Sequence, residues 1–550
     1  MKIRLSVGND LFRPLREDGC YYIDKTGLIS ELVKGNADNK VTLITRPRRF
    51  GKTLNMSMLN SFFSINEDSK KLFQGLKISE DTETVSEWMN SYPTVFISFK
   101  DVMGRTYEMA LNMLRTVISD FCIQNKYLEG NEKADGNDKE LLARLRSKDS
   151  SEQDIIDSVY CISKTMYDIF GKPAIILIDE YDVPMSYANE YGYHNEMLDV
   201  IRAMFSKALK TNPYLKFAVI TGCLRIAKES IFTGTNNFVS YSVTDSAFSE
   251  YFGFTKREVN KLLDDAGAFD KADTVKEWYD GYRFGKTDVY CPWDVINYVS
   301  ALFRDKDAKP LNYWENTSHN SIIRKFVDHK EFGINRKFET LLNGGTIRQK
   351  VSDNLTYDML YRSADNLWSA LLMTGYLTPT GDEYPDGSIS LKIPNKEVED
   401  IFRNTVVEWF NDNLDRSVQA ELMNAFWNGD ADTATKLMSK LLFKTISYND
   451  YHENYYHAFL AGIFAGLGYD VESNKEMGLG RSDIIIRDYS EQRAMVIETK
   501  HSKSESTLDE DSKKAVRQIN EKEYADELDG YELVLKYGIA FYKKKCLIKL

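Results

Sequence analysis

The sequence predicts a multidomain α/β protein, and three features of the 550-residue chain lead to this prediction. Short apolar runs rich in β-branched residues lie at 41–45, 94–99, 174–178 and 217–221. Longer stretches with helical spacing, such as 107–124 and 195–209, separate these runs. The runs are apolar throughout instead of alternating, which is typical of parallel strands covered by helices on both faces. Residues 1–240 are therefore predicted to form one α/β domain.

The chain is too long for a single hydrophobic core, because such cores stop growing at about 250–300 residues. The middle region, 241–435, begins with an aromatic, turn-rich stretch at 277–285 and continues with helical segments. A helix at 366–373, a short strand at 375–378 and a strand at 388–393 after a Pro-Asp-Gly turn then suggest a winged-helix-like unit. Such a unit can bind DNA or pack as a lid, and both roles remain open.

The last region, 436–550, is predicted to be a small α/β domain. A helix at 452–467 precedes a Gly-Arg turn, and two strands follow at 483–487 and 494–500. A charged helix at 513–528 and a final strand at 533–541 complete the unit, which ends near the basic run 543–545.

Composition excludes several classes of protein. Hydrophobic residues make up 43% of the chain, enough to fill several cores, so a disordered protein is excluded. The N-terminus lacks the apolar core of a signal peptide, and no apolar run approaches the length of a membrane span. The six cysteines form no CxxC pair, and the presence of only six histidines argues against a His-rich metal site. We therefore expect a cytoplasmic protein with reduced thiols and no membrane partner.

Charge is distributed unevenly along the chain. The net charge is −12, which argues against a protein that coats nucleic acid indiscriminately. Residues 436–550, however, hold 18 lysines and arginines against 19 acids, so that region is nearly neutral. This balance permits a nucleic-acid site near the C-terminus.

A phosphate-binding loop is predicted between the first strand and the helix after it. The segment 46–53 ends in Gly51-Lys52-Thr53 directly before a helical stretch. In a P-loop, Gly51 would allow the tight turn, Lys52 would reach the β- and γ-phosphates, and Thr53 would ligate Mg²⁺. ATP is the expected ligand. The alternative is a solvated basic loop.

The rest of the loop departs from the general P-loop pattern. Arg46 stands where the first glycine of GxxxxGK[ST] is expected. Arg46, Arg48 and Arg49 add positive charge that could hold phosphates or contact a partner. We assign Arg46, Arg49 and Phe50 to the nucleotide site together with the Gly-Lys-Thr segment.

An acidic strand end supports the phosphate loop. The apolar run 174–178 leads into Asp179 and Glu180, the pattern of a Walker B motif. Asp179 would assist Mg²⁺ through its water shell, and Glu180 would polarise the attacking water as a general base. The alternative is a core strand whose end happens to be acidic.

A third strand end adds two further candidates. The run 217–221 ends at Thr221, which could sense the γ-phosphate. Arg225 follows and could neutralise charge in the transition state. A strand cap and a surface arginine are the alternative roles for these two residues.

These motifs, in this order, resemble bacterial AAA-ATPase-like proteins that carry a C-terminal PD-(D/E)XK nuclease domain. The resemblance covers nearly the whole chain. Besides the loop 46–53, it includes 7–12, 16–26, 179–182, 221–222 with 230–232, 278–283 and 290–293. It implies a P-loop NTPase domain followed by a restriction-endonuclease-like domain. In that family Arg-Pro-Arg-Arg-Phe-Gly-Lys-Thr is the usual loop, so Arg46 fits the resemblance.

Two carboxylates and a lysine form a candidate metal site in the last region. Asp483 begins one predicted strand, and Glu498 and Lys500 end the next. A tight hairpin can bring the two acids to one sheet edge, where they would bind Mg²⁺, or Mn²⁺ in its place. The metal would activate water for phosphodiester cleavage, with Lys500 near that water and Glu453 as a further acid. A surface hairpin with paired charges is the alternative.

The resemblance extends to this region and adds Gln518, which would contact the site or a phosphate backbone. Three functions stay open at this point. The chain could be a nucleotide-controlled nuclease acting on DNA or RNA. It could be a nucleotide-dependent switch or scaffold with an inactive nuclease fold, or an ATPase whose last domain holds a protein partner. The sequence does not decide the oligomeric state.

Overall fold

The architecture comes from a computed structural model. It describes residues 3–35, 40–225, 238–314, 335–342, 344–352, 355, 359–360, 363–413, 416–445, 456, 460, 463–464, 469–477 and 480–550. The chain separates into two compact units. Unit 1 consists of Met1–Ser318 and Arg348–Glu397, and unit 2 of His319–Ile347 and Val398–Leu550. The three-domain division at residues 240 and 435 stays a prediction.

A five-stranded parallel sheet organises the first part of unit 1, in the order β2-β3-β4-β1-β5. Its strands are buried because helices cover both faces, as their continuous apolar runs predict. The sequence predicted all of them except β5. The strands are β1 (Val41–Thr45), β2 (Thr94–Ser98), β3 (Ala174–Asp179), β4 (Leu215–Gly222) and β5 (Phe238–Tyr241).

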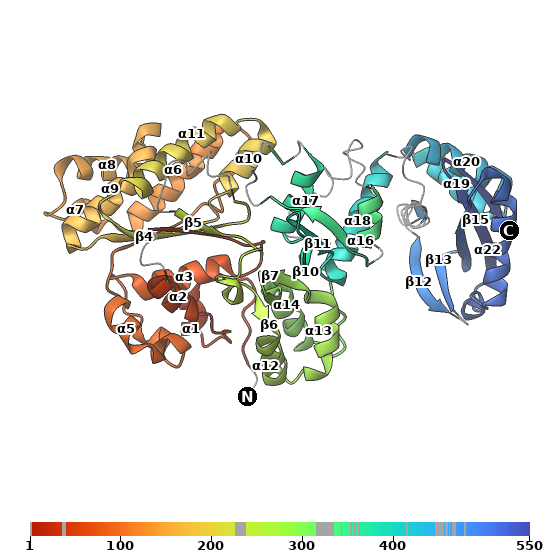
Figure 1. Ribbon diagram of the computed structural model, residues 1–550, viewed down its shortest axis with the longest axis horizontal. Helices are drawn as coiled ribbons and strands as arrows, with labels where there is room; N and C mark the ends of the chain where they lie inside the picture. The colour runs from red at the N-terminus through yellow and green to blue at the C-terminus, as the bar shows by residue number, and fades with distance from the viewer. Residues whose placement is uncertain are drawn as a thin grey trace. The chain divides into compact units, whose positions relative to one another are not determined.

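Helices lie on the two sides of this sheet (Figure 1). One side carries α1 (Phe12–Glu17), α2 (Gly27–Gly35), α3 (Lys52–Phe63) and α5 (Thr82–Trp88). The other side carries α6 (Tyr107–Gln124), α8 (Gly136–Ser147), α9 (Glu152–Phe170), α10 (Val183–Tyr191) and α11 (His194–Phe205). Two short helices, α4 (Lys70–Phe73) and α7 (Tyr127–Gly130), complete this part.

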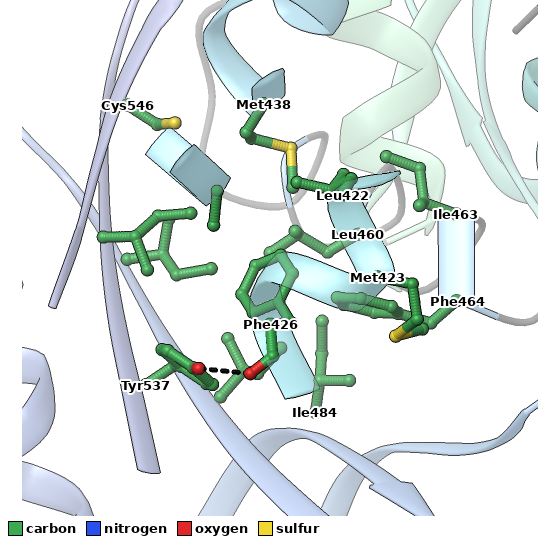
Figure 2. Close-up of a cluster of buried hydrophobic side chains, with 14 of the residues drawn as sticks. Leu422, Met423, Phe426, Met438, Leu460, Ile463, Phe464, Ile484, Tyr537 and Cys546 are labelled. Carbon is green, nitrogen blue, oxygen red and sulfur yellow. Dashed lines mark hydrogen bonds between the residues drawn. The ribbon is translucent and has the colours of Figure 1, made fainter. Parts of the chain in front are cut away.

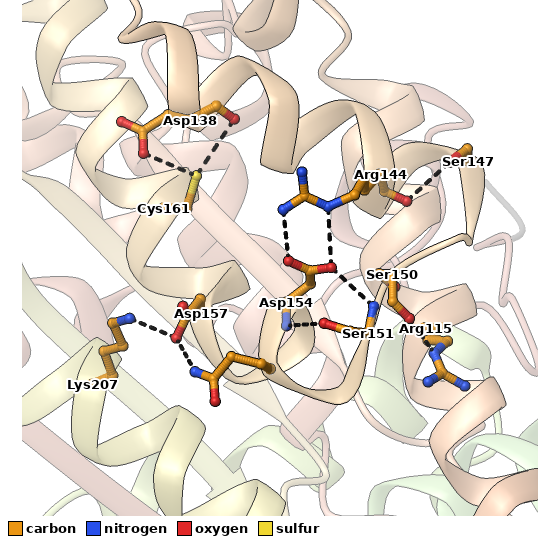
Figure 3. Close-up of polar contacts among 11 residues, drawn as sticks. Arg115, Asp138, Arg144, Ser147, Ser150, Ser151, Asp154, Asp157, Cys161 and Lys207 are labelled. Carbon is orange, nitrogen blue, oxygen red and sulfur yellow. Dashed lines mark hydrogen bonds and ion pairs between the residues drawn. The ribbon is translucent and has the colours of Figure 1, made fainter.

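Capping and ion pairing fix the start of α9 (Figure 3). Ser151 and Asp154 form a capping box, in which each side chain accepts a backbone N–H of the other residue. Arg144 of α8 donates to both carboxylate oxygens of Asp154, at 2.8 and 3.2 Å. Arg115 of α6 donates to the carbonyl of Ser150 just before the cap. Three helices of this layer are thereby joined at one point.

The rest of unit 1 contains two three-stranded sheets. The first, β6-β8-β7, packs with α12, α13 and α14 around an aromatic core. The second, β10-β11-β9, follows α17 in the helix–strand–turn–strand order that the sequence predicted. β10 begins at 378, not 375, because Gly375 adopts φ 90° to end α17. The bounds are β6 (Phe254–Thr255), α12 (Lys256–Ala266), α13 (Ala272–Tyr279), β7 (Tyr282–Phe284), β8 (Thr287–Tyr290), α14 (Pro292–Leu302), β9 (Ile347–Lys350), α17 (Ala364–Met373), β10 (Thr378–Glu383) and β11 (Ser388–Lys392).

Unit 2 is built on a mixed sheet of order β12-β13-β14-β15-β16, in which only the β14–β15 pair is parallel. The sequence missed both edge strands, β12 and β16. It also placed the charged helix at 513–528, whereas α22 spans Leu508–Glu521. The predicted helix 452–467 lies largely outside the described residues. The bounds are α16 (Asn335–Leu342), α18 (Lys396–Asn413), α19 (Arg416–Trp427), α20 (Ala431–Thr445), β12 (Asp470–Met477), β13 (Gly480–Asp488), β14 (Arg493–His501), β15 (Leu533–Tyr542) and β16 (Lys545–Lys549).

The two faces of this sheet pack against different helices. On one face, Ile484 and Tyr537 pack with residues of α19 and α20, and the Tyr537 hydroxyl donates to the carbonyl of Phe426 (Figure 2). On the other face, Ile485 and Val496 pack with Ile519 of α22. Because side chains alternate along a strand, residues 483, 498 and 500 belong to the face that α22 covers. Within the described part of the chain, no helix combines the length and apolarity that a membrane crossing requires.

Candidate functional site

The predicted phosphate loop joins the end of β1 to the start of α3. Gly51 stands at the N-cap of α3 with φ 81°, a left-handed conformation that glycine adopts without strain. No side chain caps this helix, so its first backbone N–H groups are available to an anion. The N–H of Arg46 bonds to the carbonyl of Gly222, which ties the loop to the end of β4.

Lys52 is held over the loop by neighbouring acceptors. Its Nζ donates to the carbonyls of Arg46 and Pro47 at 3.2 and 3.1 Å and lies 3.4 Å from Oε1 of Glu180. Burial by itself lowers the pKa of Lys52, but the nearby Cys223 and carboxylates outweigh burial and raise it. The ammonium group therefore stays charged, which is the state that phosphate binding requires.

Asp179 lies at the centre of the site. Its two carboxylate oxygens accept hydrogen bonds from the hydroxyls of Thr53, at 2.7 Å, and Thr221, at 2.5 Å. Burial first, and then the charge of Glu180, raise the pKa of Asp179 to about 6, while both hydroxyls and Lys52 oppose this rise. Because β4 lies between β3 and β1, five of the predicted residues meet at the carboxyl ends of these strands: Lys52, Thr53, Asp179, Glu180 and Thr221.

The turn after β3 contains a buried acid that the sequence analysis did not single out. Asp182 accepts the backbone N–H groups of Cys223 and Leu224 at 3.0 and 2.9 Å. A Cβ added at Gly222 would lie 2.6 Å from Oδ1 of Asp182 and from the Tyr181 ring. Asp182 thus docks the acidic turn against the end of β4. In the sequence, the position of Asp182 two residues after Glu180 was the signal that could have identified it.

The Arg46 side chain points into the interior of unit 1, and its assignment to the nucleotide site stays a prediction. Its side chain is fully buried, and its guanidinium lies over the rings of Phe252 and Phe284. Its two Nη groups donate to main-chain carbonyls, whereas its buried Nε has no hydrogen-bond partner. The accepting carbonyls belong to Thr45, Tyr241, Ser242 and Ala247. Arg46 therefore braces the loop from inside.

Phe50 and Arg49 anchor the loop to the middle region. Phe50 is fully buried, with its ring 4.9 Å from that of Tyr282. The Arg49 guanidinium lies 4.0 Å from the Trp293 ring centroid. Neither geometry places these side chains as phosphate ligands, and that role stays a prediction for Arg49. Arg225, the last described residue before 238, also keeps its role only as a prediction.

A buried carboxyl pair lies in the same middle region. Asp294 of α14 and Glu397 at the start of α18 are both fully buried, and neither Oδ atom of Asp294 nor Oε2 of Glu397 has a hydrogen-bond partner while both carboxyls are ionised. Burial is the main reason that the pKa of Asp294 rises to about 6 and that of Glu397 to about 10. Two ionised acids could not share this interior, so the pair holds a proton at neutral pH. Glu397 also accepts the N–H of Trp314 at 2.9 Å.

In unit 2, the structure brings Asp483 and Glu498 to adjacent strands. Ile484 pairs with Ile497 in the β13–β14 ladder, so the two acids lie one position beyond that pair. Oδ2 of Asp483 accepts both the N–H and the hydroxyl of Thr499, at 2.7 and 2.8 Å. Lys500 donates to Oε1 of Glu498 at 2.9 Å. The predicted convergence of the three charged residues is present in this hairpin.

Burial disfavours the ionised form of the Glu498 carboxyl. Its side chain is 2% exposed, and burial followed by the charge of Asp483 raises its pKa to about 7, against the effect of Lys500. The neighbouring strand position is Gly538, where a Cβ would lie 2.2 Å from the carbonyl of Ser512. Glycine here therefore lets α22 approach the sheet directly beside Glu498.

Comparison with known proteins decides the family of each part. Residues 6–232 match the family described as "Predicted AAA-ATPase", and residues 451–550 match the PD-(D/E)XK nuclease superfamily. The chain combines an AAA-ATPase-like domain with a PD-(D/E)XK domain. The motif order in the sequence had indicated this architecture, and the two matches confirm it.

Two individual proteins are also similar. An "uncharacterized protein in vnfD 5'region" of Azotobacter chroococcum is 27% identical over 325 residues, or 57% of this chain. The chain spans about half, 54%, of the length of that relative. A solved Walker-type ATPase of Pyrococcus abyssi is 14% identical, with a TM-score of 0.39 over 70% of this chain and 97% of its own.

The donor set of the PD-(D/E)XK domain fits a divalent cation. Oε2 of Glu498 is buried and has no hydrogen-bond partner, so it is an oxygen that an ion could satisfy. Among the described residues, no group of three or more His, Cys, Asp and Glu side chains is arranged so that it could hold a metal ion. A cation would therefore be held by Glu498, Asp483, a main-chain carbonyl and water, which is a set that Mg²⁺ accepts. Glu453 lies outside the described residues.

Gln518 has a different position from the three charged residues. It is half-buried on α22, one residue before the buried Ile519. Its contact with the site or with a phosphate backbone stays a prediction.

Proposed function

We propose that the chain binds and hydrolyses ATP at the loop 46–53, and that this nucleotide site controls a metal-dependent nuclease centre in the PD-(D/E)XK domain. One observation carries the proposal. The Asp179 carboxylate bonds the hydroxyls of Thr53 and Thr221 beside the Lys52–Glu180 ion pair. These are the groups that phosphoryl transfer requires, at the ends of adjacent parallel strands. The six free, buried cysteines suit the reducing cytoplasm, where we place the protein.

The nucleotide site would work by exchanging its present contacts. When bound, ATP supplies phosphate oxygens that replace the present acceptors of Lys52, and Mg²⁺ supplies positive charge beside Asp179. Lys52 would leave the carbonyls of Arg46 and Pro47 for the β- and γ-phosphates, and the Thr53 hydroxyl would turn from Asp179 to the ion. Glu180, released from Lys52, would then orient a water and accept its proton at the carboxylate.

The nuclease centre would act on a phosphodiester of DNA or RNA. Mg²⁺ or Mn²⁺ supplies an activated water when bound. Glu498 and Asp483 would hold the ion as carboxylates, with Asp483 oriented by the N–H and hydroxyl of Thr499. Lys500, two residues after Glu498 on the same face of β14, would stabilise charge near the water.

The test uses the full chain with Glu180→Gln, Glu498→Gln and Glu491→Gln. Glu491 is an exposed control between β13 and β14, at the opposite end of the hairpin from Glu498. We expect Glu180→Gln to bind ATP but hydrolyse it about 10²–10⁴-fold more slowly. Glu498→Gln should keep hydrolysis and lose cleavage of labelled DNA or RNA in Mg²⁺ or Mn²⁺, and Glu491→Gln should match the parent. Unaltered turnover in Glu180→Gln would disprove its role as the base.

A second candidate function is a nucleotide-dependent switch whose PD-(D/E)XK domain binds without cutting. One observation favours it: among the described residues, no group of three or more acidic, histidine or cysteine side chains could hold a metal ion. Metal binding by the parent, without cleavage of any nucleic acid with or without ATP, would support this function over the nuclease.

A further inference from the structure

The hairpin between β15 and β16 has an unusual turn. Tyr542 pairs with Lys545, so Lys543 and Lys544 form a two-residue turn. Lys543 has φ 55°, and tight hairpin turns with positive φ strongly favour glycine, asparagine or aspartate at such positions. The geometry of the turn therefore gives no reason for a lysine at position 543, so the role of this side chain must lie elsewhere.

Aromatic packing holds this turn rigidly in place. The hydroxyl of Tyr456 donates to the carbonyl of Lys543 at 2.6 Å. The Tyr456 ring stacks on that of Phe541, with centroids 4.2 Å apart and planes 5° apart. The His501 ring also stacks on the Tyr456 ring, with centroids 6.4 Å apart. The strained turn is thus supported by the core of unit 2.

Strand pairing brings further positive charge to the same edge. Lys500 pairs with Ala540 and His501 with Phe541, so the carboxyl ends of β14 and β15 lie side by side. No acid occurs within 499–504 or 539–549. We call the group at this edge the basic rim; its members are Lys500, His501, Lys503, Lys543, Lys544 and Lys545.

Two acids pair with members of the basic rim: the buried Glu498 with Lys500 at 2.9 Å, and Glu505 with Lys545. Glu505 pairs with Lys545 at 2.6 Å, and both side chains are 59% exposed. An ion pair this exposed is screened by water and salt, and it exchanges readily for another anion.

We propose that the basic rim binds the phosphate backbone of a nucleic-acid strand and leads it to Glu498. This rests on the proposed nuclease centre, because the rim continues directly from the strand that carries Glu498. Gly538, beside Glu498, is five residues from Lys543, or about 17 Å along β15. A strand rises about 3.4 Å per nucleotide, so the rim would contact phosphates up to roughly five nucleotides from the cleaved bond. The ligand is therefore one continuous nucleic-acid strand that reaches both the basic rim and Glu498.

The test replaces Lys543 and Lys544 with Gly and Asn in the full chain. These residues suit the turn better than lysine, so the variant should melt no lower than the parent. The control variant carries Lys522→Gln and Lys536→Gln, which remove two charges of the same unit. Lys536 lies seven residues before Lys543 on β15, about 23 Å away.

Binding of labelled single-stranded and duplex DNA and RNA is measured in EDTA, so that cleavage does not contribute. We expect Lys543→Gly/Lys544→Asn to bind about tenfold more weakly than the parent. The slope of log K against log salt concentration should also be smaller in magnitude by about 1–2. The control variant should bind as the parent does. Equal binding by parent and turn variant, or equal losses in both variants, would overturn the proposal.

Two further measurements distinguish nucleic-acid binding by the basic rim from nuclease activity and from binding to a membrane surface. Cleavage in Mg²⁺ or Mn²⁺ tests the nuclease centre: weaker binding by the turn variant, with no cleavage by the parent, keeps the rim and rejects the nuclease. Binding to phosphatidylserine vesicles tests a membrane surface in place of nucleic acid. If the turn variant loses vesicle binding alone, the rim is not a nucleic-acid site.

Discussion

The buried pair of Asp294 and Glu397 makes the stability of unit 1 depend on pH. We consider Glu397→Gln, which keeps the size of the side chain and removes one ionisable group. In the parent protein, the N–H of Trp314 donates to Oε1 of Glu397. The amide oxygen of Gln can accept this same N–H, and its amide nitrogen can donate to Asp294. The variant therefore needs no proton to satisfy the pair.

The magnitude follows from the proton that the folded pair retains. In the unfolded chain both carboxyls have ordinary pKa values near 4, so both are ionised above about pH 6. In the folded chain the raised pKa of Glu397, about 10, keeps one proton on the pair. The stabilisation is complete below about pH 4 and is lost as pH rises through the folded pKa, by about 1.4 kcal/mol per pH unit. Between pH 7 and pH 9 the parent should lose about 2.7 kcal/mol that Glu397→Gln does not lose.

The assay is calorimetric unfolding at pH 6–9 in pairs of buffers with different ionisation enthalpies. The difference between parent and variant should be about one proton released on unfolding near pH 8. Glu277→Gln, an exposed carboxylate on α13, serves as the control and should match the parent. Identical proton release and identical pH slopes in parent and Glu397→Gln would refute the shared proton.

Other changes test the packing around the two sites. Lys52→Ala should abolish binding of labelled ATP, since Lys52 is the main positive charge facing the terminal phosphates; retained binding would place the site elsewhere. Arg46→Met should lower the free energy of unfolding by about 3–5 kcal/mol in denaturant titrations, because buried carbonyls lose their donor. Gly538→Ala should destabilise unit 2 by about 1–3 kcal/mol, since its Cβ would meet the Ser512 carbonyl; an unshifted melting curve would contradict this close approach.

Local patterns in the sequence determined the elements and most of the motif positions. The continuous apolar runs identified β1 to β4 because parallel strands are buried on both faces. β5, β12 and β16 escaped notice. They are edge strands, and an edge strand needs no continuous apolar run. The motif order also indicated the ATPase and nuclease-like domains, since the loop and acidic strand ends are short-range features.

Only the tertiary structure decided what each side chain faces. The sequence assigned Arg46 to the nucleotide site, and only the structure shows that carbonyls of Tyr241, Ser242 and Ala247 accept its guanidinium N–H groups. The Asp294–Glu397 pair is 103 positions apart in sequence, so no local pattern could predict its shared proton. The spacing of Asp483 and Glu498 allowed a common site, yet the burial of Glu498 depends on Gly538, which lets α22 approach the sheet beside it. Period and spacing are local properties, whereas burial and charge pairing arise when distant segments pack together.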